Sequence, residues 1–542
     1  MRRRSFLRLG SAALALPALA ACQPPTRLRT LGLDIRVLRP GMDFGHALRD
    51  RAALPEPTDV RHTEVAILGG GIAGLTAAWR LAREGWHDFL LLSGPEPDGN
   101  AASTHFEAGG EILRAPRGAH YLPLPSRESM HVREILADLG FLRGDPAAER
   151  PEYDEAALVH APAERVWFDG AWHEELLPSS AAPAAEVVQH HRFEATIARL
   201  RAARGADGRR LFAMPMALSS ADPATRALDR HTFAAWLAAE GYTAPSLLTY
   251  LDYVCRDDFG AGIDTVSAWI GLHYFAARDG HAANGEDGAV LTWPEGLGRL
   301  AAGLRGRLPA GRTLAASALR VRQHAKGVEV LCRDAQGHAF LLRARRAICA
   351  MPLHVAARVL PDLDTPGLDP ALLPEQAPWL VGNLLLKGFP REQGSVPLAW
   401  DNVVHGGRGL GWVVSTHQDL RAARPVHTVF TLYRALADQP AVEARRWLQA
   451  ADASSLFEAV MTDLDRVYDP VELWRRAVAL EITVRGHGMA VPRPGFLSDP
   501  GLARLREADG AILFAHSDLS GYSVFEEAAW WGDLAARRIL GA

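Results

Sequence analysis

Short apolar runs and one helical pattern mark the first part of a parallel sheet. The run Glu64–Leu68 (EVAIL) precedes a glycine-rich turn, a helical pattern over Leu75–Glu84 and a second apolar run, Phe89–Leu92. Gly85 stands where helices commonly end on glycine. Because continuous apolar runs are typical of parallel strands that are buried on both faces, this stretch predicts a strand–helix–strand unit.

Two later stretches show related patterns. Residues 286–365 contain a helical pattern, alternating strand patterns and the apolar run Ala347–Met351, and Ala511–Phe514 is followed by a helical pattern over Glu526–Leu540. We predict an α/β fold in which a Rossmann-like nucleotide-binding domain, built from three pieces, is interleaved with a mixed α+β substrate domain. The predicted boundaries are residues 61–150, 286–365 and 506–542 for the nucleotide-binding domain, and 151–285 and 366–505 for the substrate domain.

The start of the chain carries the features of an export signal. Residues 1–22 combine a basic start with an apolar run shorter than the ~20 residues needed to span a bilayer. Arg3–Arg8 (RRSFLR) resembles a twin-arginine signal, and Leu19–Cys22 (LAAC) resembles a lipobox. We expect export by the Tat translocase and a periplasmic or cell-envelope lipoprotein with its membrane anchor on Cys22. The alternative is an ordinary signal peptide with a chance cysteine. Residues 23–60, rich in Pro and Arg, are predicted to be a tether.

Composition narrows the class of partner. The formal net charge is −4 over 542 residues, which argues against nucleic acid and against a polybasic membrane-surface protein. After Cys22, the cysteines are Cys255, Cys332 and Cys349, without metal-ligand spacing. We therefore predict free thiols and no metal site, and a small molecule as the partner.

A glycine turn supplies the candidate nucleotide site. Gly69, Gly71 and Gly74 form GxGxxG between a predicted strand and a predicted helix. The first glycine allows the turn, the second lets a pyrophosphate approach the backbone, and the third packs the helix on the strand. An acid that binds the adenosine ribose is expected about 20 residues on, but Ser93 stands there. Either Ser93 or Glu96 takes this role, or the fold has lost its nucleotide.

Further motifs resemble the flavin-containing amine oxidase superfamily. Arg117–Tyr121 (RGAHY), Phe514–Asp518 (FAHSD) and Ser520–Ser523 (SGYS) are similar to family segments beside FAD, while Asp98–Ala101 (DGNA) replaces a usual Gly-Gly-Arg. The resemblance implies FAD as the cofactor. The implied cofactor-binding residues are Gly69, Gly71, Ile72, Ala73, Gly74, Ser93, Glu96, Gly99, Asn100, Gly118, Ala119, His120, Ala318, Asp518, Gly521, Tyr522 and Ser523.

The resemblance also indicates candidate catalytic residues. Tyr522 matches one aromatic wall beside the flavin, and Asn383 stands where many family members carry a lysine. No aromatic residue occupies the opposite wall in Arg485–Met489. His120 and His487 are expected beside the flavin, where an imidazole can polarise the ring or accept a proton. Loss of the lysine favours an electron acceptor other than oxygen.

Acidic pairs suggest the substrate. Asp257-Asp258 and Glu526-Glu527 could present carboxylates to a cation, although helix-end acids often have only a structural role. We expect oxidation of an amine, with a polyamine as a candidate because of these acids, by hydride transfer to FAD. Two alternatives stay open: an FAD-dependent dehydrogenase or desaturase acting on a non-amine, and a non-catalytic flavin-binding lipoprotein.

Overall fold

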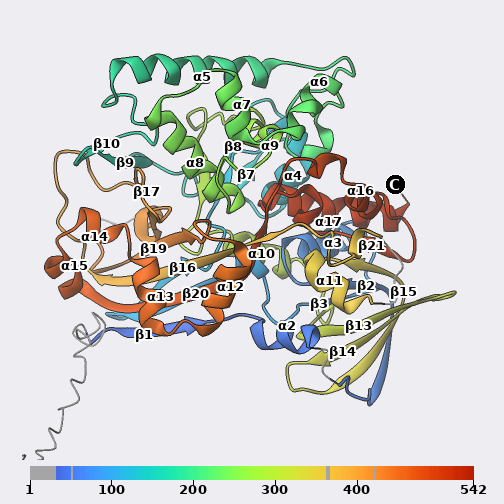
Figure 1. The fold of residues 1–542 in the computed structure, drawn as a ribbon. Helices are drawn as coiled ribbons and strands as arrows, with labels where there is room; N and C mark the ends of the chain where they lie inside the picture. Colours follow the sequence, from blue (N-terminus) through green and yellow to red (C-terminus); the bar gives the residue numbers. More distant parts are fainter. Residues whose placement is uncertain (1–31, 51–52, 362–365, 420–422, 542) are drawn as a thin grey trace, which may run out of the picture.

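Stretches from both ends and the middle of the chain assemble one sheet (Figure 1). The computed structural model describes residues 32–50, 53–361, 366–419 and 423–541. The strand order is β12-β3-β2-β15-β14-β13, and β21 pairs with β15. The strands are β2 (Asp59–Leu68), β3 (Phe89–Leu92), β12 (Thr313–Leu314), β13 (Ala316–His324), β14 (Gly327–Asp334), β15 (Ala339–Cys349) and β21 (Ile512–Phe514).

This sheet is parallel at its centre. β2 pairs in parallel with β3 and with β15, and β21 is parallel to β15. The residues that the strand patterns predicted, Glu64–Leu68 and Phe89–Leu92, lie in β2 and β3, and their apolar side chains are buried. The α/β fold is therefore confirmed, and the sheet draws its strands from three separate stretches of the chain.

A second sheet has the order β1-β20-β16-β19-β18-β17-β9-β10. It draws strands from both predicted substrate segments. Its strands are β1 (Asp34–Leu38), β9 (Glu164–Phe168), β10 (Ala171–His173), β16 (Gln376–Lys387), β17 (Asp401–Val404), β18 (Trp412–Val414), β19 (His427–Ala435) and β20 (Ala477–Ala490). Short two-stranded pairs complete the strands: β4 (Ser103–Ala108) with β5 (Glu111–Pro116), β6 (Tyr121–Pro123) with β11 (Val290–Thr292), and β7 (Leu142–Arg143) with β8 (Glu152–Tyr153).

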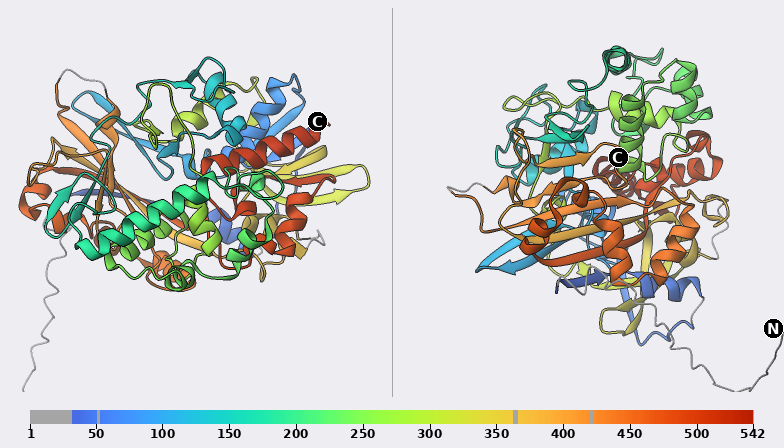
Figure 2. Two further views of the ribbon diagram at one scale, coloured as in Figure 1. Left: turned by 90° about the horizontal axis from the view of Figure 1, so that it is seen from above. Right: turned by 60° about the vertical axis from the view of Figure 1, so that its left-hand side comes forward.

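Helices cover the sheets in separate groups. Those of residues 151–285 lie together at the top of Figure 1, and Figure 2 shows the same group from two other sides. This group is α5 (Ala184–Ala202), α6 (Pro223–Arg226), α7 (Phe233–Ala239), α8 (Pro245–Phe259) and α9 (Ala268–Ala276). The second sheet is accompanied by α12 (Ala441–Ala450), α13 (Ala453–Val460), α14 (Leu464–Val467) and α15 (Pro470–Arg476). The remaining helices are α2 (Met42–Arg49), α3 (Ile72–Arg83), α4 (Met130–Asp138), α10 (Gly298–Gly306), α11 (Leu353–Val359), α16 (Pro500–Glu507) and α17 (Phe525–Leu540).

The tether predicted for residues 23–60 is wrong over much of its length. β1 and α2 are folded there, and β2 begins at Asp59. β1 exists because it pairs in parallel with β20, more than 400 residues later, and a local pattern carries no information about such a partner. The signal peptide, the Tat motif and Cys22 lie outside the described residues and stay predictions. Within the described part of the chain, no helix is long and apolar enough to cross a membrane.

Helices α3 and α17 hold the nucleotide-binding domain together through a buried ion pair. Arg80 and Asp533 are only 2% and 3% exposed, and Arg80 Nε lies 2.5 Å from Asp533 Oδ1. Arg80 also pairs with Glu134. Removing one partner of a buried pair costs about 3–5 kcal/mol where it leaves the charge uncompensated. Because Arg80 keeps Glu134 as a partner, we expect Asp533→Ala to lower the free energy of unfolding by about 3 kcal/mol, the lower end of that range.

Denaturant unfolding followed by tryptophan fluorescence would measure this loss. The control is Glu152→Ala, which breaks the exposed Arg143–Glu152 pair and should change stability by at most about 1 kcal/mol. Equal losses in the two variants would contradict the importance of the buried pair.

Candidate functional site

A cavity of about 730 Å³ lies at the carboxyl ends of β2, β3 and β15, where open α/β sheets bind nucleotides. Strand β20 and the start of α17 form other walls. Many of the predicted cofactor residues line it: Gly69, Gly71, Ile72, Ala73, Ser93, Glu96, Gly99, Asn100, Ala119, Ala318, Asp518 and Ser523. The predicted residues outside this lining are Gly74, Gly118, His120, Gly521 and Tyr522.

The glycines of the turn have two different roles. A Cβ on Gly74 would lie 1.9 Å from the carbonyl oxygen of Gly69, so Gly74 allows α3 to approach β2. A Cβ on Gly71, in contrast, would meet nothing within 4 Å. Gly71 is the N-cap of α3 and has no side-chain capping bond, so the N-terminus of the helix is available to an anion from the cavity. This geometry fits a pyrophosphate.

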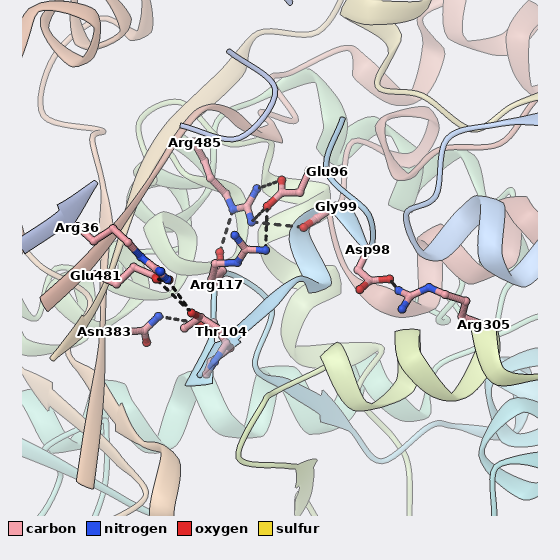
Figure 3. A network of polar contacts seen from close by, with 11 residues as sticks. Arg36, Glu96, Asp98, Gly99, Thr104, Arg117, Arg305, Asn383, Glu481 and Arg485 are labelled. Carbon is pink, nitrogen blue, oxygen red and sulfur yellow. Dashed lines mark hydrogen bonds and ion pairs between the residues drawn. The ribbon is translucent and has the colours of Figure 1, made fainter. Parts of the chain in front are cut away.

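The loop after β3 is held by an arginine from the second sheet (Figure 3). Arg485 of β20 donates to both carboxylate oxygens of Glu96, at 2.9 and 3.2 Å. It also donates to the carbonyl oxygens of Arg117 and Gly99, and Asn100 Nδ2 donates to Gly488 O at 2.7 Å. The carboxylate of Glu96 is therefore already bound by Arg485. A contact of Glu96 or Ser93 with the adenosine ribose stays a prediction.

Sequence reasoning missed Arg485. The only signal was its place in Arg485–Met489, the segment expected beside the flavin, and its partner Glu96 lies 389 positions earlier. Here the usual Gly-Gly-Arg is replaced by Asp98–Ala101, and an arginine from a different strand lies against the same loop.

A buried acid lies at the opposite end of the chain. Burial disfavours the charged form of Asp518, but the nearby His516 and the Leu353 backbone N–H, which donates at 2.9 Å, outweigh it and hold the pKa well below its usual range. Asp518 is therefore ionised at neutral pH and lines the cavity. A buried ionised carboxylate requires hydrogen-bond donors, and the ribityl hydroxyls of a flavin nucleotide are suitable donors. The residues present thus fit FAD.

The surroundings of the two predicted catalytic histidines disfavour their charged forms. His487 lines the cavity and stacks on His354 with ring centroids 4.4 Å apart. His487 is exposed at the cavity wall; partial desolvation there, followed by the nearby His354, lowers its pKa. Burial likewise lowers the pKa of His120 to about 3. A base with so low a pKa accepts a proton poorly at neutral pH, so both histidines are better suited to positioning than to proton transfer.

Asn383 and Tyr522 are both held by hydrogen bonds to other protein groups, and the catalytic roles that the resemblance implied for them stay predictions. Asn383 is fully buried: its Nδ2 donates to Pro116 O at 2.9 Å and its Oδ1 accepts from Thr431 Oγ1 at 2.7 Å. Tyr522 is also fully buried, and its hydroxyl donates to Asp258 Oδ1 at 3.0 Å. Both side chains are committed to protein partners and neither lines the cavity, because a strand centre and a packed helix interface enclose them.

A cluster of acids and tyrosines adjoins the cavity at the loop of Gly118–His120. Arg278 donates to Asp258 Oδ1 at 3.1 Å and to the hydroxyls of Tyr121 and Tyr274. We call this group the acid–tyrosine cluster; its members are Tyr121, Tyr250, Tyr253, Tyr274, Tyr433, Tyr522, Asp257, Asp258, Asp401 and Arg278.

The cluster is joined to the cavity by direct contacts. Tyr433 donates its hydroxyl hydrogen to Gly118 O at 3.0 Å and stacks on His120 at 4.5 Å, while the neighbouring Ala119 lines the cavity. Tyr121, Tyr250, Tyr253 and Tyr274 are only partly buried, so the cluster borders accessible space. Sequence analysis named Asp257, Asp258 and Tyr522, and Tyr121 within its motif, but it missed Tyr250, Tyr253, Tyr274, Tyr433 and Arg278, which come from separate elements.

Burial perturbs the acids of this cluster. It raises the pKa of Asp401 to about 8, with Glu164 as a second cause, and it raises that of Asp258 to about 6 even though Arg278 opposes the shift. The pKa of Asp257 is also raised, by burial and then by Asp258 and Asp401. Perturbed groups gathered beside a cavity are typical of functional sites.

Comparison with known proteins agrees with this geometry. The model of a family described as flavin containing amine oxidoreductase matches residues 72–540. The chain belongs to this family. It is therefore an FAD-dependent oxidoreductase of the amine oxidase type. When bound, FAD would accept the electrons that are removed from the substrate.

Solved structures share the fold at low sequence identity. Wild-type putrescine oxidase bound to putrescine has a TM-score of 0.60 at 15% identity, covering 89% of this chain and 100% of its own. Cyclohexylamine oxidase from Brevibacterium oxydans has a TM-score of 0.60 at 18% identity, covering 88% and 99%. A reduced UDP-galactopyranose mutase has a TM-score of 0.58 at 14% identity, covering 88% and 94%.

A D-amino acid dehydrogenase from Rhizorhabdus wittichii is 35% identical over 95 residues, 18% of this chain. The match spans only a fifth of that enzyme.

Proposed function

We propose that the protein oxidises a cationic amine of the diamine or polyamine class, bound in the acid–tyrosine cluster. The observation that carries this proposal is the cluster itself. It gathers six of the nine tyrosines of the chain with three aspartates and one arginine beside the loop of Gly118–His120. Tyrosine faces and carboxylates are the groups that attract an ammonium ion.

The three aspartates of the cluster outnumber its one cationic side chain, Arg278, so the cluster can accept the positive charge of a substrate. Asp258 already accepts hydrogen bonds from Arg278 and Tyr522. Asp257 and Asp401 raise the pKa of both Tyr253 and Tyr433, after burial as the main cause, so these two acids lie close to the same two rings. An ammonium group placed between them would restore their ionised forms. A substrate with two ammonium groups can hold one against these acids while its other end reaches the loop of Gly118–His120, next to the cofactor cavity.

The residues of the cluster perform binding and positioning. The acids orient the chain of the substrate, the half-buried rings exclude water from its methylene groups, and His120, stacked on Tyr433, fixes the boundary with the cofactor cavity. The structural relative that was solved with putrescine binds a substrate of this class, which supports the proposal.

Anaerobic mixing of the FAD-loaded protein with putrescine, spermidine, cyclohexylamine and D-alanine would test it. We expect putrescine or spermidine, in excess over the protein, to bleach the absorbance of the oxidised flavin. Bleaching by D-alanine alone would replace the proposal with a D-amino acid dehydrogenase. A yellow protein that none of the four bleaches would reject an amine of these classes and favour a non-amine dehydrogenase.

A further inference from the structure

We propose that the N-terminal segment 34–50 is a clamp that closes the cofactor cavity, with α2 forming a wall against the adenosine end of FAD. The segment contains β1 and α2 and is called the N-terminal clamp below. It lies outside the part of the chain that matches the family, which begins at residue 72. The proposal rests on FAD as the cofactor and is independent of the substrate.

One half of the clamp is attached to the second sheet. β1 pairs in parallel with β20 over five residue pairs. Arg36 forms an ion pair with Glu481, whose side chain is 1% exposed, while that of Arg36 is 62% exposed. Arg39 donates to the carbonyl oxygens of Leu448 and Ala451, at the end of α12, at 3.2 and 2.9 Å. Unpaired carbonyls at a helix end are favourable partners for a cation.

The other half reaches across to the nucleotide-binding domain. A Cβ on Gly41 would lie 3.3 Å from Pro95 Cγ, in the loop that follows β3. Arg333 of β14 lies over the ring of Phe44, 5.7 Å from its centroid, and α2 also contacts α11. The clamp therefore bridges the two domains. In a Rossmann fold, the loop after the second strand is where the adenosine ribose binds, so α2 lies at the adenosine end of the cavity.

Several residues of α2 line the cavity. Met42, Phe44, His46 and Leu48 all line it, and none of the residues of α2 is fully buried. An eight-residue helix is marginally stable by itself, so contacts with a nucleotide in the cavity would stabilise both partners. Ser93 stands where an acid is expected to bind the ribose, and a covering wall offsets the loss of that contact. Release of FAD would then require the clamp to open.

A reversible cross-link between Gly41 and Pro95 tests the clamp directly. The Cβ built on Gly41 lies 3.9 Å from Pro95 Cβ, within the ~3.5–4.5 Å that a disulfide spans. The variant is Gly41→Cys with Pro95→Cys in a Cys22→Ser background; Cys255, Cys332 and Cys349 are buried free thiols and remain. Release of FAD from the loaded protein is followed by the rise in flavin fluorescence after dilution.

We expect oxidation of the pair to slow FAD release at least tenfold, and a reductant to restore the rate of the uncross-linked protein. The same protein in its reduced form, with the two single-cysteine variants, is the matched control. Equal release rates in the oxidised and reduced forms would overturn the proposal. Gly41 is in the left-handed conformation (φ +67°), which a side chain strains, so the single Gly41→Cys variant must first show unchanged secondary structure and FAD binding. In a protein that passes this check, failure of the two thiols to pair under oxidant would contradict the docked position of the clamp.

A second variant loosens the clamp without a cross-link. Arg36→Gln with Glu481→Gln removes both charges together, so that no buried carboxylate is left unpaired. We expect FAD release to become about three- to tenfold faster, with secondary structure unchanged by circular dichroism. The control is Arg143→Gln with Glu152→Gln, which removes an exposed ion pair whose two residues do not line the cavity. A release rate equal to that of the control would argue against the clamp.

Discussion

Replacing Gly71 with alanine is expected to leave the protein folded but to weaken FAD binding by about 10- to 100-fold, or about 1.4–2.8 kcal/mol. A Cβ at this position meets no protein atom within 4 Å, so the fold accepts it. The same Cβ stands at the N-terminus of α3, where the pyrophosphate must approach the backbone closely. The loss is therefore confined to the cofactor.

Gly74→Ala is the matched comparison, three residues along the same turn. Its Cβ would lie 1.9 Å from Gly69 O, so α3 has to move away from β2. Overpacking of this kind costs about 1–3 kcal/mol or more, and we expect reduced stability in the apoprotein itself. Titration of apoprotein with FAD and thermal unfolding without FAD separate the two effects. Wild-type affinity in Gly71→Ala would contradict the placement of the pyrophosphate.

The KM for a cationic amine is expected to fall by up to about tenfold per pH unit as the pH rises from 6 to 8. Above pH 8 it should level off. Burial, with Glu164 as a second cause, raises the pKa of Asp401 to about 8. Below that pH the carboxyl is protonated, and binding an ammonium must first displace the proton. Asp401→Asn should raise the KM at pH 8 about tenfold or more and flatten this part of the pH profile.

The same substitution has a stability readout that does not depend on turnover. Because the pKa of Asp401 is raised on folding, its contribution to stability is fully present below about pH 4, the pKa in an unfolded chain, and is lost as the pH rises through about 8. Asp401→Asn should therefore raise the thermal unfolding midpoint at pH 8 relative to wild type more than at pH 4.5.

Asp145→Asn, which changes an exposed acid outside the cluster, serves as the control for both measurements. A pH profile of the KM in Asp401→Asn that is indistinguishable from wild type would remove Asp401 from the binding site. The proposed role of the cluster would then depend on Asp257.

The sequence indicated more of the residues that line the cofactor cavity than of those that form the acid–tyrosine cluster. Most of the cofactor residues belong to short motifs in which neighbouring residues act together, as in the turn Gly69–Gly74. The acid–tyrosine cluster is assembled from β6, α8, α9, β17, β19, the residue Arg278 after α9 and the turn at Tyr522. Of its members, the sequence indicated the adjacent pair Asp257-Asp258, Tyr522 and, within a motif, Tyr121. Asn383 shows the same limit: its position in the chain matches that of a family lysine, but in the centre of β16 its amide is bonded to Pro116 and Thr431.

By itself, the sequence determined the parallel strands, the glycine turn and the FAD-binding class, because buried strands and phosphate-binding turns are built from consecutive residues whose apolar and glycine spacing is visible locally. Only the tertiary structure decided that β1 joins β20, that Arg485 binds Glu96, and that α2 covers the cavity. These contacts join residues hundreds of positions apart. These contacts are stabilised by strand pairing, by ion pairs and by burial of side chains, and all three form only when the chain has folded.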